Sequence, residues 1–382
     1  MVTAQTPARQ REPNWRERMP LALRGFLFTL IPIWLIGLLG LWLLPIHAHH
    51  WMPPVTRWLG LFARWDSAWY YHIADIGYWR TAAYAFSPLY PLLMRGLHVV
   101  TGLPLVLSGE VIGWASDLVA LFFLVRLWRE EAGPEVARRA LWLLLAYPAA
   151  FFLLAMYPES LYLMLSVITY LLLRRSRYLW AAVAMAFAAL SRANGILLIL
   201  PYLAFAWEAS GRKLDRLFWR RAALSLIGVA GLSIYLGYSW ATTGNPLQFL
   251  AQQATWHRHF TGGAFALAYA LIHIFYGQGL PLTITDFLAP LAFLGLIAFD
   301  RGRLTLGDKL YVFFGVLSIL VDPSIPNGFV LMSATRLVMP YFPVYRVAAE
   351  RLTERQWRIA LGVMGFFQLW FWFTYTHWWF SG

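Results

Sequence analysis

Residues 62–91 read FARWDSAWYYHIADIGYWRTAAYAFSPLYP, and they differ from the rest of the chain in mixing charged with aromatic side chains. Two carboxylates, two arginines and a histidine stand among Trp, Tyr and Phe residues. Trp and Tyr rings prefer the level of the lipid headgroups, where one edge of the ring is wet and the other is apolar. The stretch is therefore predicted to form interfacial helices after a first membrane-spanning helix.

The composition around this stretch is that of a polytopic membrane protein. Of the 382 residues, 60% are hydrophobic and 13% are charged, whereas about 25% of residues in an average soluble domain are charged. Because a spanning helix needs about 20 apolar residues, we predict an all-α fold with about 11 transmembrane helices. We expect a single domain over residues 1–382, with a cytoplasmic tail at 1–20 and an extracytoplasmic loop at 47–103.

The apolar runs that carry this prediction are separated by polar or basic segments. They lie at residues 21–46, 104–128, 140–156, 161–173, 178–190, 195–207, 222–240, 280–299, 310–320, 337–348 and 359–373. Alternation across the membrane then places the N-terminus in the cytoplasm and the C-terminus outside. The many Trp and Phe residues are expected mostly to face lipid or to pack between helices.

The net charge of +13 is distributed as the positive-inside rule predicts for cytoplasmic loops. The basic residues form no stripe on a soluble face, so we expect no nucleic-acid partner. Seven arginines remain outside on this topology and need another explanation: Arg57, Arg64, Arg80, Arg95, Arg192, Arg258 and Arg336. The absence of cysteine excludes a disulfide framework and a thiolate metal site.

Asp66 is the first candidate for chemistry. If its segment is helical, Trp65, Trp69 and His72 share one face, and Asp66 lies on the adjacent one. A carboxylate held there can accept a proton from a sugar hydroxyl, with its pKa set by partial burial and by Arg64. The alternative is an interfacial helix in which Asp66 pairs with Arg64 or serves as a cap.

Asp75 lies nine residues after Asp66, roughly on the opposite side of an ideal helix. It joins the same site only if the helix breaks before it. Two carboxylates in one site would suit a hydrolase or a metal centre, and this spacing is weak support for either.

The hairpin around Arg192 is too short to cross the bilayer. Its arms of about 13 residues reach about 20 Å, less than the hydrocarbon thickness of about 30 Å, so Arg192 and Asn194 are expected to lie in a cavity. An arginine there needs a counter-charge. A phosphate-bearing substrate or a salt bridge to Glu159 would each provide it, and the sequence leaves both open for Arg192 and for Arg336.

Two groups of histidines could bind a metal, namely His47, His49 and His50 in one group and His257 and His259 in the other. Neither has a convincing set of acidic residues nearby. We therefore predict no metal site and no cofactor.

Six short motifs in order resemble the PIG-V type of mannosyltransferase. The chain reads RWD at residues 64–66, IADIGY at 73–78, AFSPLYP at 85–91, YPESLY at 157–162, SRANGILL at 191–198 and TRLVMPYFPVY at 335–345. Ser87 stands where an aromatic residue is usual in that family, and Leu337 stands where tyrosine is common. The resemblance covers most of the chain.

The resemblance implies a GT-C-like membrane enzyme that uses a polyprenyl-phosphate sugar, with mannose the expected sugar. It implies Asp66 as the catalytic base and carries over Glu159, Arg192, Asn194 and Arg336 as matches to its motifs. We expect Arg192 and Arg336, as cations, to bind the donor phosphate and to stabilise it as it leaves. The expected reaction is an inverting transfer to a hydroxyl of a lipid-linked or glycan acceptor on the extracytoplasmic face. Other substrate-site candidates are Arg64, Trp65, Trp69, His72, Asp75 and His257.

The alternative function is a transporter or flippase for a lipid-linked sugar. It needs the same arginines and aromatic cavity but no base. A scaffold without a small substrate leaves Arg192 unexplained. Lys213 and Lys309 are the only lysines, an arginine bias that with the resemblance favours a bacterial plasma membrane.

Overall fold

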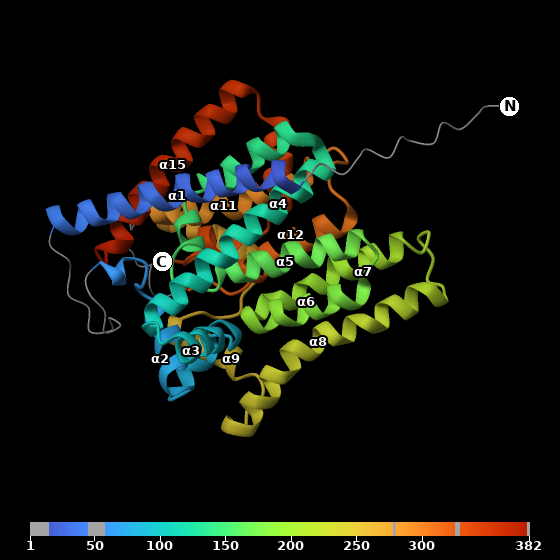
Figure 1. Cartoon of the computed structure of the whole chain (residues 1–382), viewed down its shortest axis with the longest axis horizontal. Coiled ribbons are helices and arrows are strands. Elements are labelled where there is room, and N and C mark those ends of the chain that lie inside the picture. Colours follow the sequence, from blue (N-terminus) through green and yellow to red (C-terminus); the bar gives the residue numbers. More distant parts are fainter. Residues whose placement is uncertain (1–14, 45–57, 278–279, 325–328, 380–382) are drawn as a thin grey trace.

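The computed structural model describes residues 15–44, 58–277, 280–324 and 329–379, and these ranges contain helices and no β-strand (Figure 1). The helices are α1 (Trp15–Leu43), α2 (Ser67–Ile76), α3 (Leu89–Thr101), α4 (Leu105–Leu145), α5 (Glu159–Arg174), α6 (Tyr178–Ser191), α7 (Ile199–Glu208), α8 (Arg216–Thr243), α9 (Gln248–Ala251), α10 (Gly263–Phe275), α11 (Leu280–Ala298), α12 (Leu306–Leu320), α13 (Ala334–Val338), α14 (Pro343–Arg351) and α15 (Glu354–Thr376). The predicted all-α fold is confirmed.

Five of the described helices are long and apolar enough to cross a membrane: α1, α4, α8, α11 and α15. Large apolar side chains point outward from them, with Phe28 68%, Leu226 66% and Phe366 63% exposed. Such surfaces are stable only against lipid or another apolar partner. The chain is an integral membrane protein, and the number of 11 complete spans is not confirmed, because several apolar helices, α6, α7 and α10 among them, are shorter.

Helix α4 corrects two boundaries of the prediction. The expected basic loop between 104–128 and 140–156 is helical, with a kink at Gly133, where φ is 88°, followed by Pro134. The predicted span at 140–156 is wrong, because α4 ends at Leu145 and a buried 3₁₀ turn follows at Ala150–Leu153. Pro148 lies between the two elements, and proline cannot donate the backbone hydrogen bond that a continuing helix needs.

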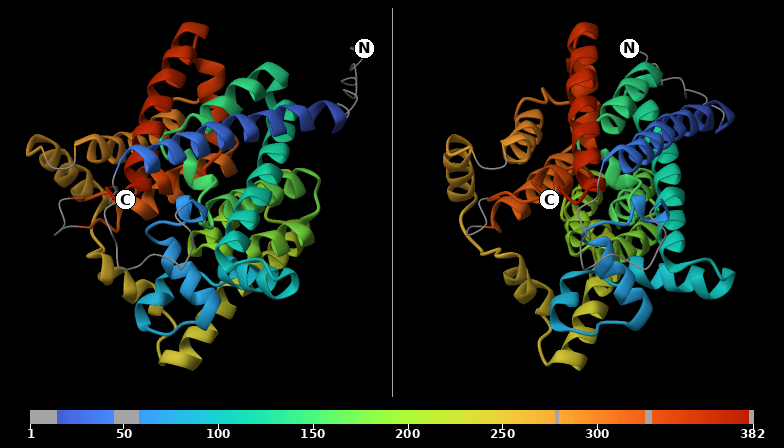
Figure 2. Two further views of the ribbon diagram at one scale, coloured as in Figure 1. Left: turned by 60° about the vertical axis from the view of Figure 1, so that its left-hand side comes forward. Right: turned by 90° about the vertical axis from the view of Figure 1, so that its left-hand side faces the viewer.

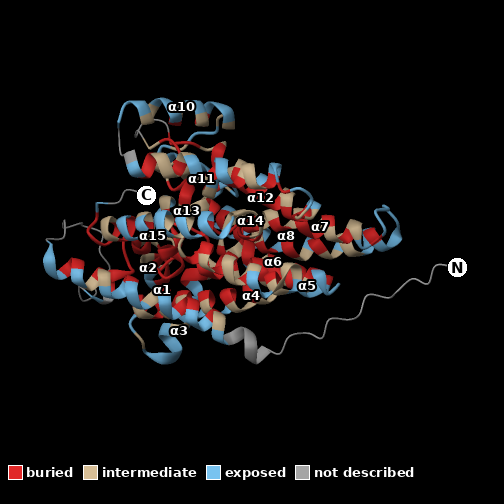
Figure 3. Ribbon diagram, turned by 90° about the horizontal axis from the view of Figure 1, so that it is seen from above, coloured by how far each residue is buried: buried red, intermediate tan, exposed pale blue. Residues whose placement is uncertain are grey.

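The run predicted at 337–348 is also wrong as one helix. It is divided between α13 and α14, and Pro340 and Pro343 lie where the chain turns. The sequence prediction assigned no element to residues 263–275, where the structure has α10. Helix α10 lies at the periphery of the bundle (Figures 2 and 3).

The short hairpin around Arg192 is confirmed, and its arms are α6 and α7. Helix α6 ends where Arg192 adopts extended backbone, and a 3₁₀ helix, Ala193–Leu198, precedes α7. A Cβ on Gly195 would lie 2.3 Å from the carbonyl of Ala188. Only glycine lets the returning arm approach so closely, and the arms pack against α8 on one side (Figure 1).

A cluster of ion pairs joins α4, α5 and α14 beside the α4 kink. Glu131 accepts contacts from Arg174 and from Arg346, whose Nε lies 2.7 Å from Glu131 Oε2. Arg303 Nε lies 2.7 Å from Glu350 Oε2 in the same region. We call these five residues the kink cluster, and they link four segments that are distant in sequence.

Candidate active site

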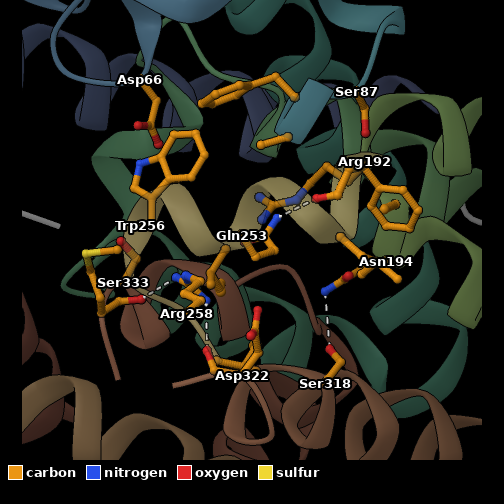
Figure 4. A pocket seen from close by; sticks show the side chains of 18 of the residues that line it. Asp66, Ser87, Arg192, Asn194, Gln253, Trp256, Arg258, Ser318, Asp322 and Ser333 are labelled. Atoms are coloured by element: carbon orange, nitrogen blue, oxygen red, sulfur yellow. Dashed lines mark hydrogen bonds between the residues drawn. The ribbon is translucent and has the colours of Figure 1, made fainter. Parts of the chain in front are cut away.

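Residues from distant segments enclose a cavity of about 690 Å³. Its charged and polar lining includes Asp66, Ser87, Glu159, Arg192, Asn194, Gln253, Arg258, His259, Ser318, Asp322, Ser333 and Arg336. Figure 4 shows Asp66, Arg192 and Arg258 around the same space. The structure therefore brings together Asp66, Glu159, Arg192, Asn194 and Arg336, the residues that the family motifs singled out.

Asp66 is held by its backbone at the start of α2. Its N–H donates to the Tyr157 hydroxyl over 3.0 Å, and that hydroxyl donates to the Arg64 carbonyl over 2.9 Å. Trp65, between them, has a φ of 56°, a left-handed conformation that costs energy for a residue with a Cβ. The fully buried Tyr157 thus fixes a strained turn and leaves the Asp66 carboxylate free to face the cavity.

Arg64 does not line the cavity and is not the partner of Asp66. Its side chain is buried and donates to the carbonyl oxygens of Gly60 and Thr376, and its guanidinium lies 5.6 Å from the centre of the Trp378 ring. The alternative in which Asp66 pairs with Arg64 is therefore wrong. Through these contacts, Arg64 fixes the backbone segment that carries Asp66 to the C-terminal end of α15.

The partner of Asp66 is Arg336, whose Nη1 lies 3.1 Å from Asp66 Oδ2. Arg336 Nε also lies 3.5 Å from Glu159 Oε1, and Arg192 Nη1 lies 2.7 Å from the same oxygen. Glu159 therefore stands between two arginines, and only 2% of its side chain is exposed, against 22% for Asp66. We call these four residues the site cluster. Glu159 holds the cations, whereas Asp66 is the carboxylate that an incoming molecule can reach.

Arg192 and Asn194 reach the cavity because the hairpin breaks there. Arg192 also lies over the Tyr162 ring, 5.9 Å from its centre. The Asn194 amide donates to Ser318 on α12 over 3.2 Å. Of the two interpretations that the sequence left open, the salt bridge to Glu159 is present in this structure.

Arg336 owes its position to a carboxylate on another helix. Asp286 on α11 accepts the N–H of Ser333 over 3.1 Å and the N–H of Thr335 over 2.7 Å. Asp286 thus satisfies the first free N–H groups of α13, as an N-cap residue would. The guanidinium of Arg336 lies over the rings of Phe152 and Tyr157, at 5.0 and 5.3 Å from their centres, so its direction is fixed from both sides.

Arg258 and Asp322 were not among the predicted site residues. Arg258 Nη2 donates to the Met332 carbonyl over 2.9 Å and Nη1 to the Asp322 carbonyl over 3.5 Å, and it forms no salt bridge within the described residues. Burial lowers the pKa of the Arg258 guanidinium, an effect that the Asp322 carboxyl opposes, and burial raises the pKa of that carboxyl. The sequence feature that points to Arg258 is its place among the seven arginines that the predicted topology puts on the extracytoplasmic side.

The remaining candidates do not line the cavity. Trp69 stacks on Phe86 at 5.4 Å and packs against Trp256 at 5.8 Å, and both of these residues line the cavity. Trp65 precedes α2 and packs against Trp378 at 5.1 Å, so it does not share a helical face with Trp69 and His72. His72 is half-buried and packs beside Trp79, whereas Asp75 is exposed. His257 adopts a left-handed backbone conformation and is two residues before His259, which lines the cavity.

Metal binding remains a matter of prediction. His47, His49 and His50 lie outside the described residues. Among the residues that the structure describes, no group of three or more His, Asp or Glu side chains is arranged to hold a metal ion.

Comparison with known proteins matches residues 53–210 to the mannosyltransferase (PIG-V) family. That range includes the motifs from RWD to SRANGILL. No curated protein matches the chain in sequence.

Two solved structures share the fold, both of ArnT from Cupriavidus metallidurans. The form bound to undecaprenyl phosphate is 16% identical with a TM-score of 0.52, over 89% of this chain and 62% of that one. The apo form is 18% identical with a TM-score of 0.50, over 88% and 60%. The chain thus spans about three fifths of the length of those proteins. The likeness confirms the expected GT-C-like fold.

Proposed function

Because residues 53–210 match the mannosyltransferase (PIG-V) family and the chain shares the fold of ArnT, we propose that it is a PIG-V-type glycosyltransferase of the GT-C class. It transfers mannose from a polyprenyl-phosphate donor to a hydroxyl of a lipid-linked or glycan acceptor. The transfer inverts the anomeric configuration and takes place on the extracytoplasmic face of a bacterial plasma membrane. One observation carries this proposal: a reachable carboxylate, Asp66, shares a cavity of about 690 Å³ with three arginines.

The proposed reaction uses Asp66 as general base. Its carboxylate takes the proton of the acceptor hydroxyl, and the oxygen attacks the anomeric carbon as the bond from that carbon to the phosphate oxygen breaks. The polyprenyl phosphate leaves with one more negative charge than the donor phosphate carried. Fixed cations beside that oxygen lower the barrier because the charge develops in the transition state.

Arg258 is the arginine best suited to meet the donor phosphate first. Among the residues that the structure describes, its guanidinium donates only to main-chain carbonyls, whereas Arg192 and Arg336 are paired with carboxylates. A phosphate can add bidentate hydrogen bonds to a guanidinium without displacing a carboxylate from it. Arg192 and Arg336, which the sequence analysis assigned to the donor phosphate, then complete the contact from the site cluster.

The Arg336–Asp66 pair has a consequence for the order of binding. The Asp66 carboxylate is bonded to the guanidinium cation of Arg336 over 3.1 Å, so that oxygen is occupied before substrate binds. A donor phosphate near Arg336 competes for that cation and releases Asp66 toward the acceptor. The donor is therefore proposed to bind before the acceptor.

We propose that no metal takes part. A phosphate is a good leaving group, so no general acid is required, and three arginines offer the positive charge that a divalent cation supplies in other phosphate-dependent enzymes. Full transfer in the presence of EDTA is the expected result. Loss of transfer that is restored by a divalent cation would overturn this part of the proposal.

The test is an assay with purified protein, radiolabelled polyprenyl phosphate mannose and a panel of glycolipid acceptors. We expect label in the acceptor, joined with the opposite anomeric configuration to that of the donor. A parallel experiment follows movement of the labelled donor across protein-containing vesicles. Movement of intact donor with no transfer to any acceptor would favour the transporter and overturn the glycosyltransferase.

A further inference from the structure

A second cavity, of about 380 Å³, lies where α1 and the kinked part of α4 meet. None of its lining residues lines the cavity of the site cluster. Figure 1 shows the start of α1 well separated from α2. Three arginines line it: Arg24 on α1 and Arg129 and Arg138 on α4. The proposed transfer uses none of them.

Two of these arginines lack a counter-ion. Arg24 and Arg129 form no salt bridge within the described residues, and the Nε of Arg129 is buried without a hydrogen-bond acceptor there. A buried donor without an acceptor costs about 1–3 kcal/mol. Arg138 differs, because its Nε donates to Glu135 over 2.9 Å. The lining therefore has an excess of positive charge and an unused donor.

The α4 kink adds to this positive charge. Gly133 breaks the helix with its φ of 88°, and a new helical stretch begins at Pro134, so the first N–H groups of that stretch have no helical acceptor. Pro134 and Glu135 from this first turn line the cavity. The dipole of the new stretch contributes partial positive charge at the same place.

The surface beside the cavity is apolar. Leu23 and Leu27 lie one residue before and three residues after Arg24 on α1, and they are 37% and 39% exposed. Both belong to the apolar span Pro20–Leu43 of α1, which is long enough to cross a membrane. A molecule with an anionic head and an apolar tail would place its head on the arginines and its tail along this face.

We propose that this cavity binds the headgroup phosphate of an anionic phospholipid, with the acyl chains lying along Leu23 and Leu27. Guanidinium groups bind phosphate oxygens in bidentate geometry. Arginine-lined pockets between helices at the membrane surface have the charge and the depth that such headgroups need. The site is separate from that of the sugar donor and does not depend on the proposed transfer.

The experiment measures lipid binding to the purified full chain by native mass spectrometry, with phosphatidylglycerol and phosphatidylcholine as probes. The variant is the double substitution Arg24→Gln with Arg129→Gln. The matched control is Arg216→Gln with Arg220→Gln, two exposed arginines at the start of α8 that do not line the cavity. We expect the double variant to bind phosphatidylglycerol about 30-fold more weakly, and the control to bind it like the unaltered chain.

Other outcomes overturn the proposal. An unchanged preference for phosphatidylglycerol in the double variant, or an equal loss in the control, would remove the assignment to this cavity. Displacement of the lipid by inorganic phosphate would exclude a phospholipid as the ligand of this cavity. Stronger binding of polyprenyl phosphate than of phosphatidylglycerol at this site would exclude it as well. If the double variant fails to fold, Arg24→Gln alone serves, since Arg24 is exposed on α1, and we expect about a fivefold loss.

Discussion

The site cluster and the kink cluster are built from the same types of side chain, arginine and carboxylate, in different surroundings. In each, a carboxylate stands between two arginines: Glu159 between Arg192 and Arg336, and Glu131 between Arg174 and Arg346. The kink cluster joins helices, and none of its members lines the cavity of the site cluster. The site cluster lines that cavity and includes a second carboxylate, Asp66.

The two clusters differ in access: Asp66 of the site cluster is 22% exposed and lines the cavity, whereas Glu131 of the kink cluster is 10% exposed and does not. Buried ion pairs contribute little net stability, because desolvation offsets their attraction, yet breaking one is costly. Substitutions in the two clusters are therefore expected to affect different properties of the protein. Changes in the site cluster reduce turnover, and changes in the kink cluster reduce stability.

The largest expected effect is on turnover in Asp66→Asn. Loss of a general base lowers kcat by about 1,000-fold, while donor binding persists because the arginines remain. The measurement is label transfer from radiolabelled polyprenyl phosphate mannose, with donor binding measured separately. Asp75→Asn, which changes an exposed carboxyl of the same segment, is the control and should retain full turnover. Near-normal transfer by Asp66→Asn would exclude it as the base.

The next effect is on stability in Glu131→Gln. The substitution leaves Arg346 and Arg174 without their shared carboxylate, which we expect to lower the free energy of unfolding by about 3 kcal/mol. Denaturant unfolding in detergent measures the change. The control is Glu354→Gln, which removes an exposed pair with Arg358 of 2.8 Å and should cost less than about 0.5 kcal/mol.

The same variant tests the division between the clusters. Transfer per folded molecule should be unchanged in Glu131→Gln. A fall in turnover comparable to that of Asp66→Asn, without loss of stability, would contradict the structural role of the kink cluster.

Arg258→Gln is expected to have a smaller effect, on donor recognition. Removing a guanidinium from a phosphate lowers kcat/KM for the donor by about 30-fold, which corresponds to about 2 kcal/mol. Arg258→Lys should recover part of the loss, because it keeps the charge but not the bidentate geometry. Arg95→Gln, at another arginine of the outer segments, is the control. An unchanged kcat/KM in Arg258→Gln would remove Arg258 from the phosphate site.

The smallest expected effect comes from Thr305→Ala, at the start of α12 near the kink cluster. The Thr305 hydroxyl accepts the Asp308 N–H over 3.1 Å, and the Asp308 carboxylate accepts the Thr305 N–H over 2.9 Å. Loss of this capping box should cost about 1 kcal/mol of unfolding free energy. Ser233→Ala, in the middle of α8, should change it much less, and equal changes in the two variants would contradict the capping role.

Much of the fold could be predicted because it depends on local pattern. The length and apolar character of α1, α8 and α15 are written in consecutive residues, and the short arms around Arg192 follow from counting them. The apolar composition of residues 140–156 and 337–348 predicts one helix for each run, whereas the prolines within both runs interrupt the helix. Helix α10 was missed because its 13 residues are fewer than a span needs.

The site was predicted in its members but not in its connections. Short motifs identified Asp66, Glu159, Arg192, Asn194 and Arg336, and the structure brings all five to one cavity. Arg258 was missed, since a loop arginine has no local pattern that distinguishes a ligand-binding side chain from a solvated one.

The sequence by itself determined a helical membrane protein with a carboxylate on an aromatic segment and arginines outside the basic loops. Only the tertiary structure decided that Asp66 meets Arg336, which is 270 positions away, and that adjacent Arg64 turns from it to anchor the backbone. The physical reason is that charge pairing depends on distances of a few ångströms. Those distances are set by how α2, α11 and α13 pack together, which no local pattern encodes.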